Sequence, residues 1–312
     1  MRDAGPIIVA LDGSELAEGA LPYAVAVARA LGQRIVLFTA WEGAEGEFGA
    51  NFPALAQEVE RRATEHYGSY LEGVRARLAA AGADVETLIR PGDAADEIPK
   101  AVEDTGARLL VLGTHGRSGI GRWLYGSTTN AVLRASHAPV LVAGPHALER
   151  SDGDVTLAHL AVPLDGSTHG EAALPVAAML AQKLSARLSL VRAVRWAAQA
   201  YPYSLPDAYL PQVDEELDAG PKAYLRRIEA TLKDTDGAQA PSPANIPEVT
   251  SYVVRGAVSE GLLEFVEKER VGLVVMTTHA RAGLARMALG STADRMTQGA
   301  APVLLIRPGT DD

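Results

Sequence analysis

Near its start the chain reads Ile7-Ile8-Val9-Ala10-Leu11-Asp12-Gly13-Ser14. The same pattern returns as Leu160-Ala161-Val162-Pro163-Leu164-Asp165-Gly166-Ser167, which places the two aspartates 153 residues apart (165 − 12). A short apolar run that ends in a turn is typical of a buried strand, and the segments that follow both runs carry apolar residues at helical spacing. The chain is therefore predicted to contain two copies of one unit.

The two copies are separated by a segment rich in turn-forming residues, Gly144 to Asp154. We expect a first domain at residues 1–146 and a second domain at residues 154–312. Later segments match at an offset of 164 (277 − 113), so the second copy carries 11 extra residues (164 − 153) between its second and third strands. The first long helix of each copy contains a proline, Pro22 or Pro175, at which it is expected either to kink or to begin.

Short apolar runs alternate with helical stretches along each copy. In the first copy the strands are predicted near residues 7–11, 34–40, 85–89, 108–112 and 139–142, and the helices near 15–31, 54–81, 94–103 and 127–136. Strands too apolar to face water on either side indicate a parallel sheet covered by helices on both faces. Right-handed crossovers make this a doubly wound α/β fold, in which ligands bind beyond the carboxyl ends of the strands.

Composition excludes several classes of function. The 312 residues include 29 Lys plus Arg against 39 Asp plus Glu, with no long basic block, which argues against a nucleic-acid partner. Cysteine is absent, which excludes disulfides, thiolate metal sites and cysteine nucleophiles. No apolar run approaches the ~20 residues of a membrane span, and no signal-peptide pattern precedes Ile7, so a cytoplasmic protein with no membrane partner is expected.

The loop after the fourth predicted strand holds five glycines in 14 positions, from Gly113 to Gly126. Glycine lets consecutive N–H groups turn toward an anion. The loop then leads through Ser127 and Thr128 into a predicted helix, whose free N–H groups favour a phosphate group. Arg117 adds positive charge. This loop is therefore predicted to bind phosphate.

The pattern Gly113-x2-Gly116-x9-Gly126-Ser127, together with Asp12 after the first strand, resembles the ATP-binding signature of the universal stress protein family. Because the unit is repeated, the chain is similar to tandem two-domain members of that family, and the resemblance covers nearly its whole length. It implies two five-stranded parallel sheets, each with the strand order 3-2-1-4-5. That order brings the loops after strands one and four side by side.

The resemblance also implies which residues hold the nucleotide. Asp12 and the backbone of Ala40 would hold the adenosine end. The phosphate end would be formed by Gly113, Gly116, Arg117, Gly126, Ser127 and Thr128. The matching positions of the second copy are Asp165, Gly290, Ser291 and Thr292. Mg²⁺ is expected to accompany the phosphates, because clustered negative charge recruits a divalent cation, although the sequence indicates no dedicated metal site.

Simpler interpretations stand beside these. By itself the Asp12–Ser14 segment is better explained as a turn and a helix cap, and only the partner loop favours binding. His115 and His279 match between the copies, but no triad or acid–base pair accompanies them, so hydrogen bonding to backbone is favoured over catalysis. The acidic stretch of predicted helix at residues 57–77 is interpreted as a solvent-exposed face, with i,i+4 pairs such as Glu58 with Arg62.

Three functions follow from these patterns. The first is an ATP-binding stress-response or regulatory protein, with slow ATP hydrolysis as an option for which no positioned base stands out. The second is an interaction module, in which the terminal strands at 139–142 and 302–306 pair the two domains edge to edge and the nucleotide is only structural. The third is an enzyme, which is disfavoured because neither Gly-x-Gly-x-x-Gly nor Gly-x-x-x-x-Gly-Lys-Ser/Thr occurs in the first loop. A homodimer and a signalling partner of unknown identity are further expectations.

The two halves are expected to bind ATP unequally. Thr277 and Ala280 replace the first two loop glycines in the second copy. If those glycines take positive φ, the replacements strain the loop by ~1–3 kcal/mol each, and the second site is weaker. If they take ordinary φ, both sites bind.

Overall fold

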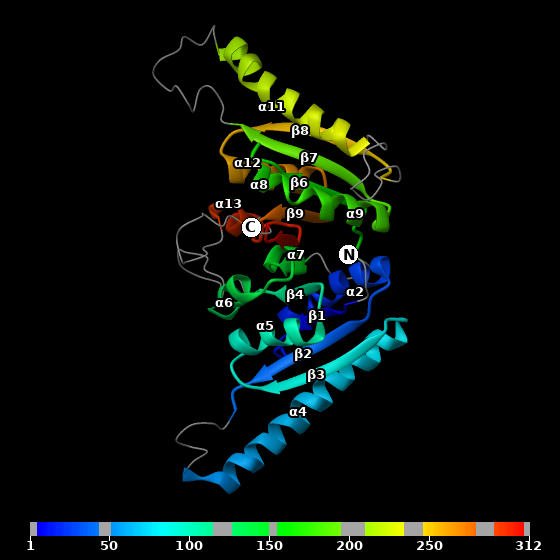
Figure 1. Cartoon of the computed structure of the whole chain (residues 1–312), viewed down its shortest axis with the longest axis vertical. Helices are drawn as coiled ribbons and strands as arrows, with labels where there is room; N and C mark the ends of the chain where they lie inside the picture. The colour runs from blue at the N-terminus through cyan, green and yellow to red at the C-terminus, as the bar shows by residue number, and fades with distance from the viewer. Residues whose placement is uncertain are drawn as a thin grey trace. The chain divides into compact units, whose positions relative to one another are not determined.

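The computed structural model describes residues 5–43, 51–114, 127–149, 155–194, 210–233, 246–278 and 290–308, without the side chains of 127 and 210–217. The chain divides into unit 1, Met1–Asp154, and unit 2, Val155–Asp312. Figure 1 shows the helices and strands of both units, coloured along the chain.

Unit 1 alternates strands and helices along the chain. Its elements are β1 (Ile7–Ala10), α1 (Glu15–Glu18), α2 (Leu21–Leu31), β2 (Ile35–Trp41), α4 (Pro53–Ala80), β3 (Val85–Pro91), α5 (Ala94–Thr105), β4 (Leu109–Gly113), α6 (Ser127–Ala135), β5 (Val140–Ala143) and α7 (Pro145–Glu149). The strands lie in the order β3-β2-β1-β4-β5, and each pair is parallel.

Unit 2 repeats this arrangement. Its elements are β6 (His159–Pro163), α8 (Thr168–Glu171), α9 (Leu174–Leu184), β7 (Arg187–Val194), α11 (Leu210–Lys233), β8 (Val249–Arg255), α12 (Val258–Lys268), β9 (Leu273–Thr277), α13 (Ser291–Met296) and β10 (Val303–Ile306). The order β8-β7-β6-β9-β10 is again parallel throughout. The predicted doubly wound fold with strand order 3-2-1-4-5 is therefore confirmed in both units.

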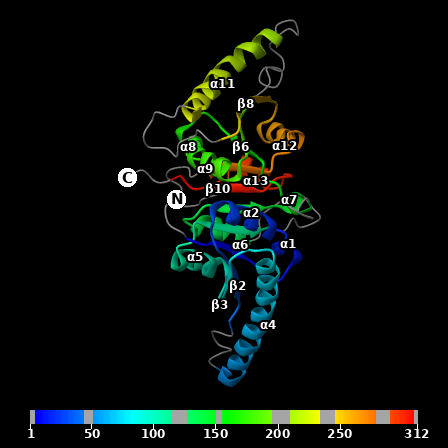
Figure 2. The ribbon, with the colours of Figure 1, turned by 90° about the vertical axis from the view of Figure 1, so that its right-hand side faces the viewer.

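Helices cover both faces of each sheet. Right-handed crossovers place α2 and α4 on one face of unit 1 and α5 and α6 on the other. Figure 2 shows α4 and α5 on opposite sides of the strands. The central strands between them are apolar and buried, with Ile7, Ile35 and Phe38 all fully shielded from solvent. Full burial of each such side chain contributes roughly 1.5–3 kcal/mol to folding.

The helix predicted at residues 15–31 is two helices. The single turn α1 ends at Gly19, and α2 begins at Leu21 with Pro22 in its first turn. Proline is tolerated there because the first N–H groups of a helix have no partner within the helix. Of the two expectations for Pro22, the helix start is confirmed, and the single continuous helix is wrong. The helix α9 begins in the same way at Leu174.

The long helices α4 and α11 pack beside the edge strands β3 and β8 (Figure 1). The buried residues Leu71 and Val74 of α4 match Leu225 and Ile228 of α11 at an offset of 154 (225 − 71). Because β3 and β8 match at 164, ten of the extra residues in unit 2 follow this part of α11 (164 − 154). Among the described residues, every helix is too short or too polar to cross a membrane.

Candidate functional site

The carboxyl ends of β1 and β4 lie side by side in unit 1, where Ala10 is the register partner of Leu112. Asp12 follows β1, and Gly113 ends β4. A Cβ atom on Gly113 would lie 2.6 Å from the carbonyl oxygen of Leu16 in α1. The backbone of α1, the helix that follows the turn at Asp12, therefore packs directly against the end of β4, at the edge where ligands bind in such sheets.

Gly113 does not take a positive φ. It is the close approach of α1, and not a left-handed backbone, that leaves no room for a side chain at this position. The premise of positive φ is therefore wrong for Gly113. In unit 2 the same position is Thr277, which is buried at the end of β9.

The Asp12–Ser14 segment forms the expected turn and cap. Asp12 Oδ1 accepts hydrogen bonds from the Ser14 N–H at 2.9 Å and the Ser14 hydroxyl at 2.6 Å. Ser14 Oγ in turn accepts from the Ala17 N–H at 3.1 Å and caps α1. The second carboxylate oxygen of Asp12, Oδ2, has no partner among the described residues, and the side chain is exposed. The turn thus presents a free acceptor at the carboxyl edge.

Gly13 in this turn has φ +84°, and no atom of the described residues lies within 4 Å of the position of its absent Cβ. A positive φ of this size favours glycine over any residue with a side chain. The backbone beside Asp12 is therefore open to a ligand.

The carboxyl end of β2 lies next to this turn. Thr39 is buried and donates its hydroxyl hydrogen to the carbonyl oxygen of Leu11. Ala40 is half-buried, and Trp41 is 7% exposed. The indole Nε1 of Trp41 is buried and has no hydrogen-bond partner among the described residues. Such a donor is a position at which a ligand or an ordered water supplies the missing acceptor.

The sequence did not single out a pair of residues near the crevice of unit 1, Tyr70 and Glu18. The hydroxyl of Tyr70 in α4 is buried and lacks an aligned hydrogen-bond partner in the described part of the chain. Burial raises the pKa of this phenol well above its usual range, and the neighbouring Glu18 and Asp12 carboxylates raise it further. Tyr224 and Glu171 repeat the pair in unit 2, where burial and Glu171 raise the pKa of Tyr224 to about 12. The internal repeat could have revealed this pair, because the two tyrosines match at an offset of 154 residues and the two glutamates at an offset of 153.

Part of the predicted phosphate loop lies outside the described residues, namely Gly116, Arg117 and Gly126, together with His115 and His279. The described portion resumes with α6, which begins at Ser127 and carries the half-buried Thr128 in its first turn. The predicted pair of Glu58 with Arg62 is confirmed, with 2.6 Å between Glu58 Oε1 and Arg62 Nε.

Unit 2 repeats the turn after the first strand. Asp165 Oδ1 accepts from the Ser167 N–H at 3.0 Å and the Ser167 hydroxyl at 2.5 Å, and Ser167 caps α8. Gly290 is the N-cap of α13 and makes no side-chain hydrogen bond, while Ser291 and Thr292 form the first turn of that helix.

One difference between the units lies at the start of the loop after the fourth strand. His169 occupies the position of Leu16, and its Nε2 donates to the carbonyl oxygen of Thr278 at 2.8 Å. This bond ties α8 to the loop that follows β9.

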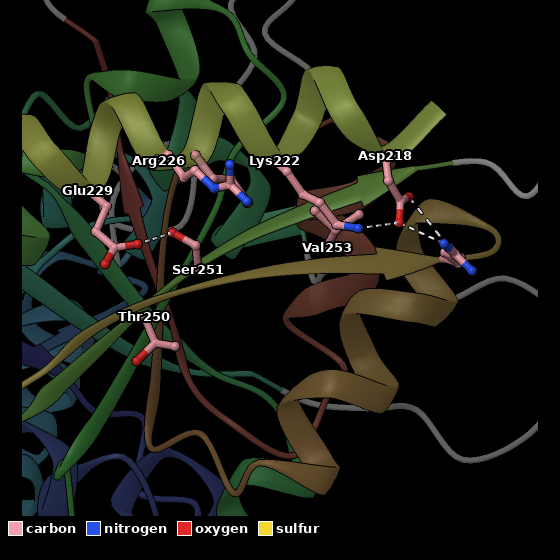
Figure 3. A pocket seen from close by; sticks show the side chains of 9 residues that line it. Asp218, Lys222, Arg226, Glu229, Thr250, Ser251 and Val253 are labelled. Carbon is pink, nitrogen blue, oxygen red and sulfur yellow. Dashed lines mark hydrogen bonds and ion pairs between the residues drawn. The ribbon is translucent and has the colours of Figure 1, made fainter. Parts of the chain in front are cut away.

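Figure 3 shows a hollow in unit 2 between α11 and the edge strand β8, with a volume of about 800 Å³. Asp218, on α11, is 4% exposed and lies 2.7 Å from Arg255 Nη2 at the end of β8 and 3.1 Å from Lys222 Nζ. Burial raises the pKa of the Asp218 carboxyl, but the hydrogen bonds from Arg255 and Lys222 outweigh burial and leave it below its usual value. Glu229 accepts from the Ser251 hydroxyl at 2.7 Å in the same hollow. Both acids of α11 are already paired with side chains of β8, so these pairs connect α11 to β8.

The described residues include no group of three His, Asp or Glu side chains placed to hold a metal ion.

Comparison with known proteins identifies the family. The model of the universal stress protein family matches this chain twice, over residues 4–144 and 157–307. The chain belongs to the universal stress protein family. Each matched segment contains one of the two five-stranded arrangements described above.

Individual relatives extend this result. Universal stress protein Rv2005c of Mycobacterium tuberculosis is 30% identical over 144 residues, which cover 44% of this chain and 45% of that protein. A universal stress protein of Mycolicibacterium smegmatis is 27% identical over 230 residues, 73% of this chain and 70% of its own length. The chain thus spans about half the length of the first curated relatives it matches. The crystal structure of a universal stress protein from Archaeoglobus fulgidus shares the fold, with a TM-score of 0.71 and 20% identity over 98% of this chain and 100% of that chain.

Proposed function

We propose that unit 1 of this universal stress protein binds ATP in the crevice between the loops after β1 and β4, and that the nucleotide regulates a response to stress. The observation that carries the proposal is the turn at Asp12, which holds a free carboxylate oxygen beside the open backbone of Gly13 and leads into α1, whose backbone packs against the end of β4. A carboxylate acceptor next to exposed backbone suits the hydroxyl groups of a ribose.

The adenosine end of the ligand would lie over the turn and the end of β2. Asp12 Oδ2 would accept from a ribose hydroxyl, and the backbone of Ala40 would contact the base. The unpaired indole N–H of Trp41, which follows Ala40, supports a ligand at this end because a buried donor without an acceptor costs roughly 1–3 kcal/mol.

The phosphate end would lie at the loop between Gly113 and Thr128. The nine-residue helix α6 begins at Ser127, and the free N–H groups of its first turn would face the phosphate oxygens. Gly116, Arg117 and Gly126 would complete this end of the site. Mg²⁺ would be held chiefly by the phosphate oxygens, since a hard cation prefers such ligands.

The substitution Asp12→Asn tests the site without removing the turn. Asparagine keeps Oδ1 as the acceptor for Ser14, but it replaces the free acceptor with an N–H donor. We expect ATP affinity, measured by titration calorimetry, to fall about tenfold or more, because a hydrogen bond to a charged group contributes roughly 1.5–3 kcal/mol. Asp93→Asn is the matched control, because Asp93 caps α5 with a similar turn beyond the edge strand β3.

Mass spectrometry of small molecules released from the denatured wild-type protein identifies the ligand directly. Release of an adenine nucleotide, with weaker binding in Asp12→Asn and unchanged binding in Asp93→Asn, supports the proposal. Unchanged affinity in the Asp12 variant would show that the crevice is not the site.

A further inference from the structure

The two crevices are built on the same backbone at the end of the first strand. Gly13 has φ +84° and Gly166 has φ +85°. Each turn is fixed by the same hydrogen bonds from a serine to the aspartate two residues before it, with N–H to Oδ1 distances of 2.9 Å and 3.0 Å. A ligand that fits one turn therefore meets the same backbone in the other, and differences must come from side chains.

One side chain differs at the adenosine end. Thr39 of β2 and Arg192 of β7 match at the offset of 153. Both donate to the same carbonyl group of the first loop, that of Leu11 in unit 1 and that of Leu164 in unit 2, where the distance from Arg192 Nη1 is 3.2 Å. The two side chains thus point the same way, but arginine extends much farther than threonine.

The longer side chain lies beside the turn, in a position that is free of described atoms in unit 1. No atom of the described residues lies within 4 Å of the position of the absent Cβ of Gly13. The same position on Gly166 lies 3.0 Å from Arg192 Nη1 and 3.3 Å from both Cζ and Nη2. The guanidinium therefore lies against the turn of unit 2, at the position beside the glycine that no described atom of unit 1 occupies.

Two further contacts hold the guanidinium there. Besides its hydrogen bond to the Leu164 carbonyl oxygen, it lies over the ring of Tyr224, with 5.6 Å from Cζ to the ring centroid. Arg227 also contacts the Tyr224 ring, with 5.4 Å from its Cζ atom to the ring centroid. Arg227 Nη2 lies 3.1 Å from Glu171 Oε1. Displacing Arg192 would break its hydrogen bond to Leu164 and its cation–π contact with Tyr224.

We propose that Arg192 closes the adenosine end of the crevice in unit 2, so that ATP binds to unit 1 alone. This inference rests on the proposed function of unit 1 and assigns the specificity between the two units to one side chain. Arg192 is a specificity-determining residue here because it lies where the nucleoside would be placed.

The full chain with Arg192→Thr tests the proposal, because threonine is the residue of unit 1 and keeps a hydroxyl donor for the Leu164 carbonyl. Titration calorimetry with Mg·ATP should give one site per wild-type chain and two sites in this variant. The control is Arg226→Thr, which makes the same change on the exposed surface of α11 and should leave one site. Thermal unfolding of both variants checks that they are folded.

Second substitutions show which unit binds. Asp12→Asn should weaken the wild-type site at least tenfold, whereas Arg192→Thr combined with Asp12→Asn should keep one tight site. Arg192→Thr combined with Asp165→Asn should return the chain to one site. This set separates a new site in unit 2 from a change in unit 1.

The outcomes are distinct for the two proposals. No binding in the wild-type chain would refute the proposed function, and this inference with it. Two wild-type sites, of which one weakens in Arg192→Thr, would leave the proposed function intact and show that Arg192 contacts the nucleotide. One site in both chains would show that another residue closes unit 2.

Discussion

The absent side chain of Gly113 would meet the carbonyl oxygen of Leu16 at 2.6 Å and the Cα atom of Ala17 at 2.9 Å. Both neighbours are backbone atoms of α1, so they cannot move aside as a flexible side chain would. Because Gly113 has no side chain, α1, the helix that follows the Asp12 turn, can pack directly against the end of β4.

Gly113→Ala should consequently destabilise unit 1 and weaken ATP binding. Overpacking at a rigid contact costs roughly 1–3 kcal/mol, and any shift of α1 moves the Asp12 turn with it. Urea unfolding and ATP titration measure the two effects. The control is Gly73→Ala in α4, where a Cβ meets nothing within 4 Å and helix propensity should add about 0.5–1 kcal/mol of stability. Equal stability of the two variants would contradict the packing argument.

The pair of Asp218 and Arg255 predicts a pH-dependent contribution to the stability of unit 2. Because the folded-state pKa of Asp218 is depressed, the contribution is present above the unfolded value and is lost as the pH falls below about 4. Asp218→Asn should cost roughly 2 kcal/mol of unfolding free energy at pH 7, because it weakens charged hydrogen bonds to Arg255 and Lys222.

Urea unfolding at pH 7 and at pH 3.5 measures the difference in unfolding free energy between the wild-type protein and Asp218→Asn. This difference should be smaller at pH 3.5. Asp104→Asn is the control, because Asp104 pairs with Arg90 at 2.7 Å but its side chain is 62% exposed, and an exposed pair contributes only about 0–1 kcal/mol. The same loss in both variants would show that burial does not strengthen the Asp218 pair.

His159 gives unit 2 a second pH dependence, at the opposite end of its sheet. Its Nε2 lies 2.7 Å from the Ser189 hydroxyl, and its Nδ1 lies 2.9 Å from Arg187 Nη2 and 3.1 Å from the Glu269 carbonyl oxygen. Burial lowers the pKa of His159 and the Arg187 charge lowers it further, against opposing effects of the Glu269 carbonyl and the Glu269 and Glu248 carboxylates. Because the folded-state pKa is depressed, the unfolded chain binds the extra proton, and stability falls as the pH drops below about 6.5.

His159→Gln should reduce this pH dependence, since glutamine does not titrate. The measurement is the urea midpoint between pH 7.5 and pH 5.5, which should fall less in the variant than in the wild-type protein. His137→Gln is the control, because the His137 side chain is 74% exposed in unit 1. A midpoint that falls equally in wild-type protein and His159→Gln would show that His159 is not the source.

The fold was predictable because it rests on local patterns that occur twice. The apolar runs at Ile7–Ala10 and His159–Pro163 become central parallel strands, and each serine after the aspartate turn caps a helix. Pro22 and Pro175 mark helix starts because a ring nitrogen without hydrogen fits the first turn. The strand order followed from the family resemblance, and the crossover rule gave only the doubly wound arrangement.

The side chains that distinguish the two crevices were not predictable in the same way. Aligning the copies sets Thr39 against Arg192, but the position of the guanidinium depends on Tyr224, which belongs to a distant helix. The role of Gly113 depended on how closely α1 approaches β4, which spacing alone does not give. Contacts of this kind arise from packing between elements far apart in the sequence.

The final prediction concerns the loop glycines that unit 2 lacks. The sequence alone predicts that Thr277→Gly with Ala280→Gly creates or tightens a second ATP site. Where Arg192 is retained beside Gly166, we expect the chain with these two changes to keep one site. The changes act on the phosphate end, while Arg192 still occupies the adenosine end of unit 2. Added to Arg192→Thr, they should tighten the second site, and Asp165→Asn should abolish the gain. Calorimetric titration of the three combinations decides the matter. A second site that appears with the glycines alone would mean that the loop, rather than Arg192, keeps ATP out of unit 2.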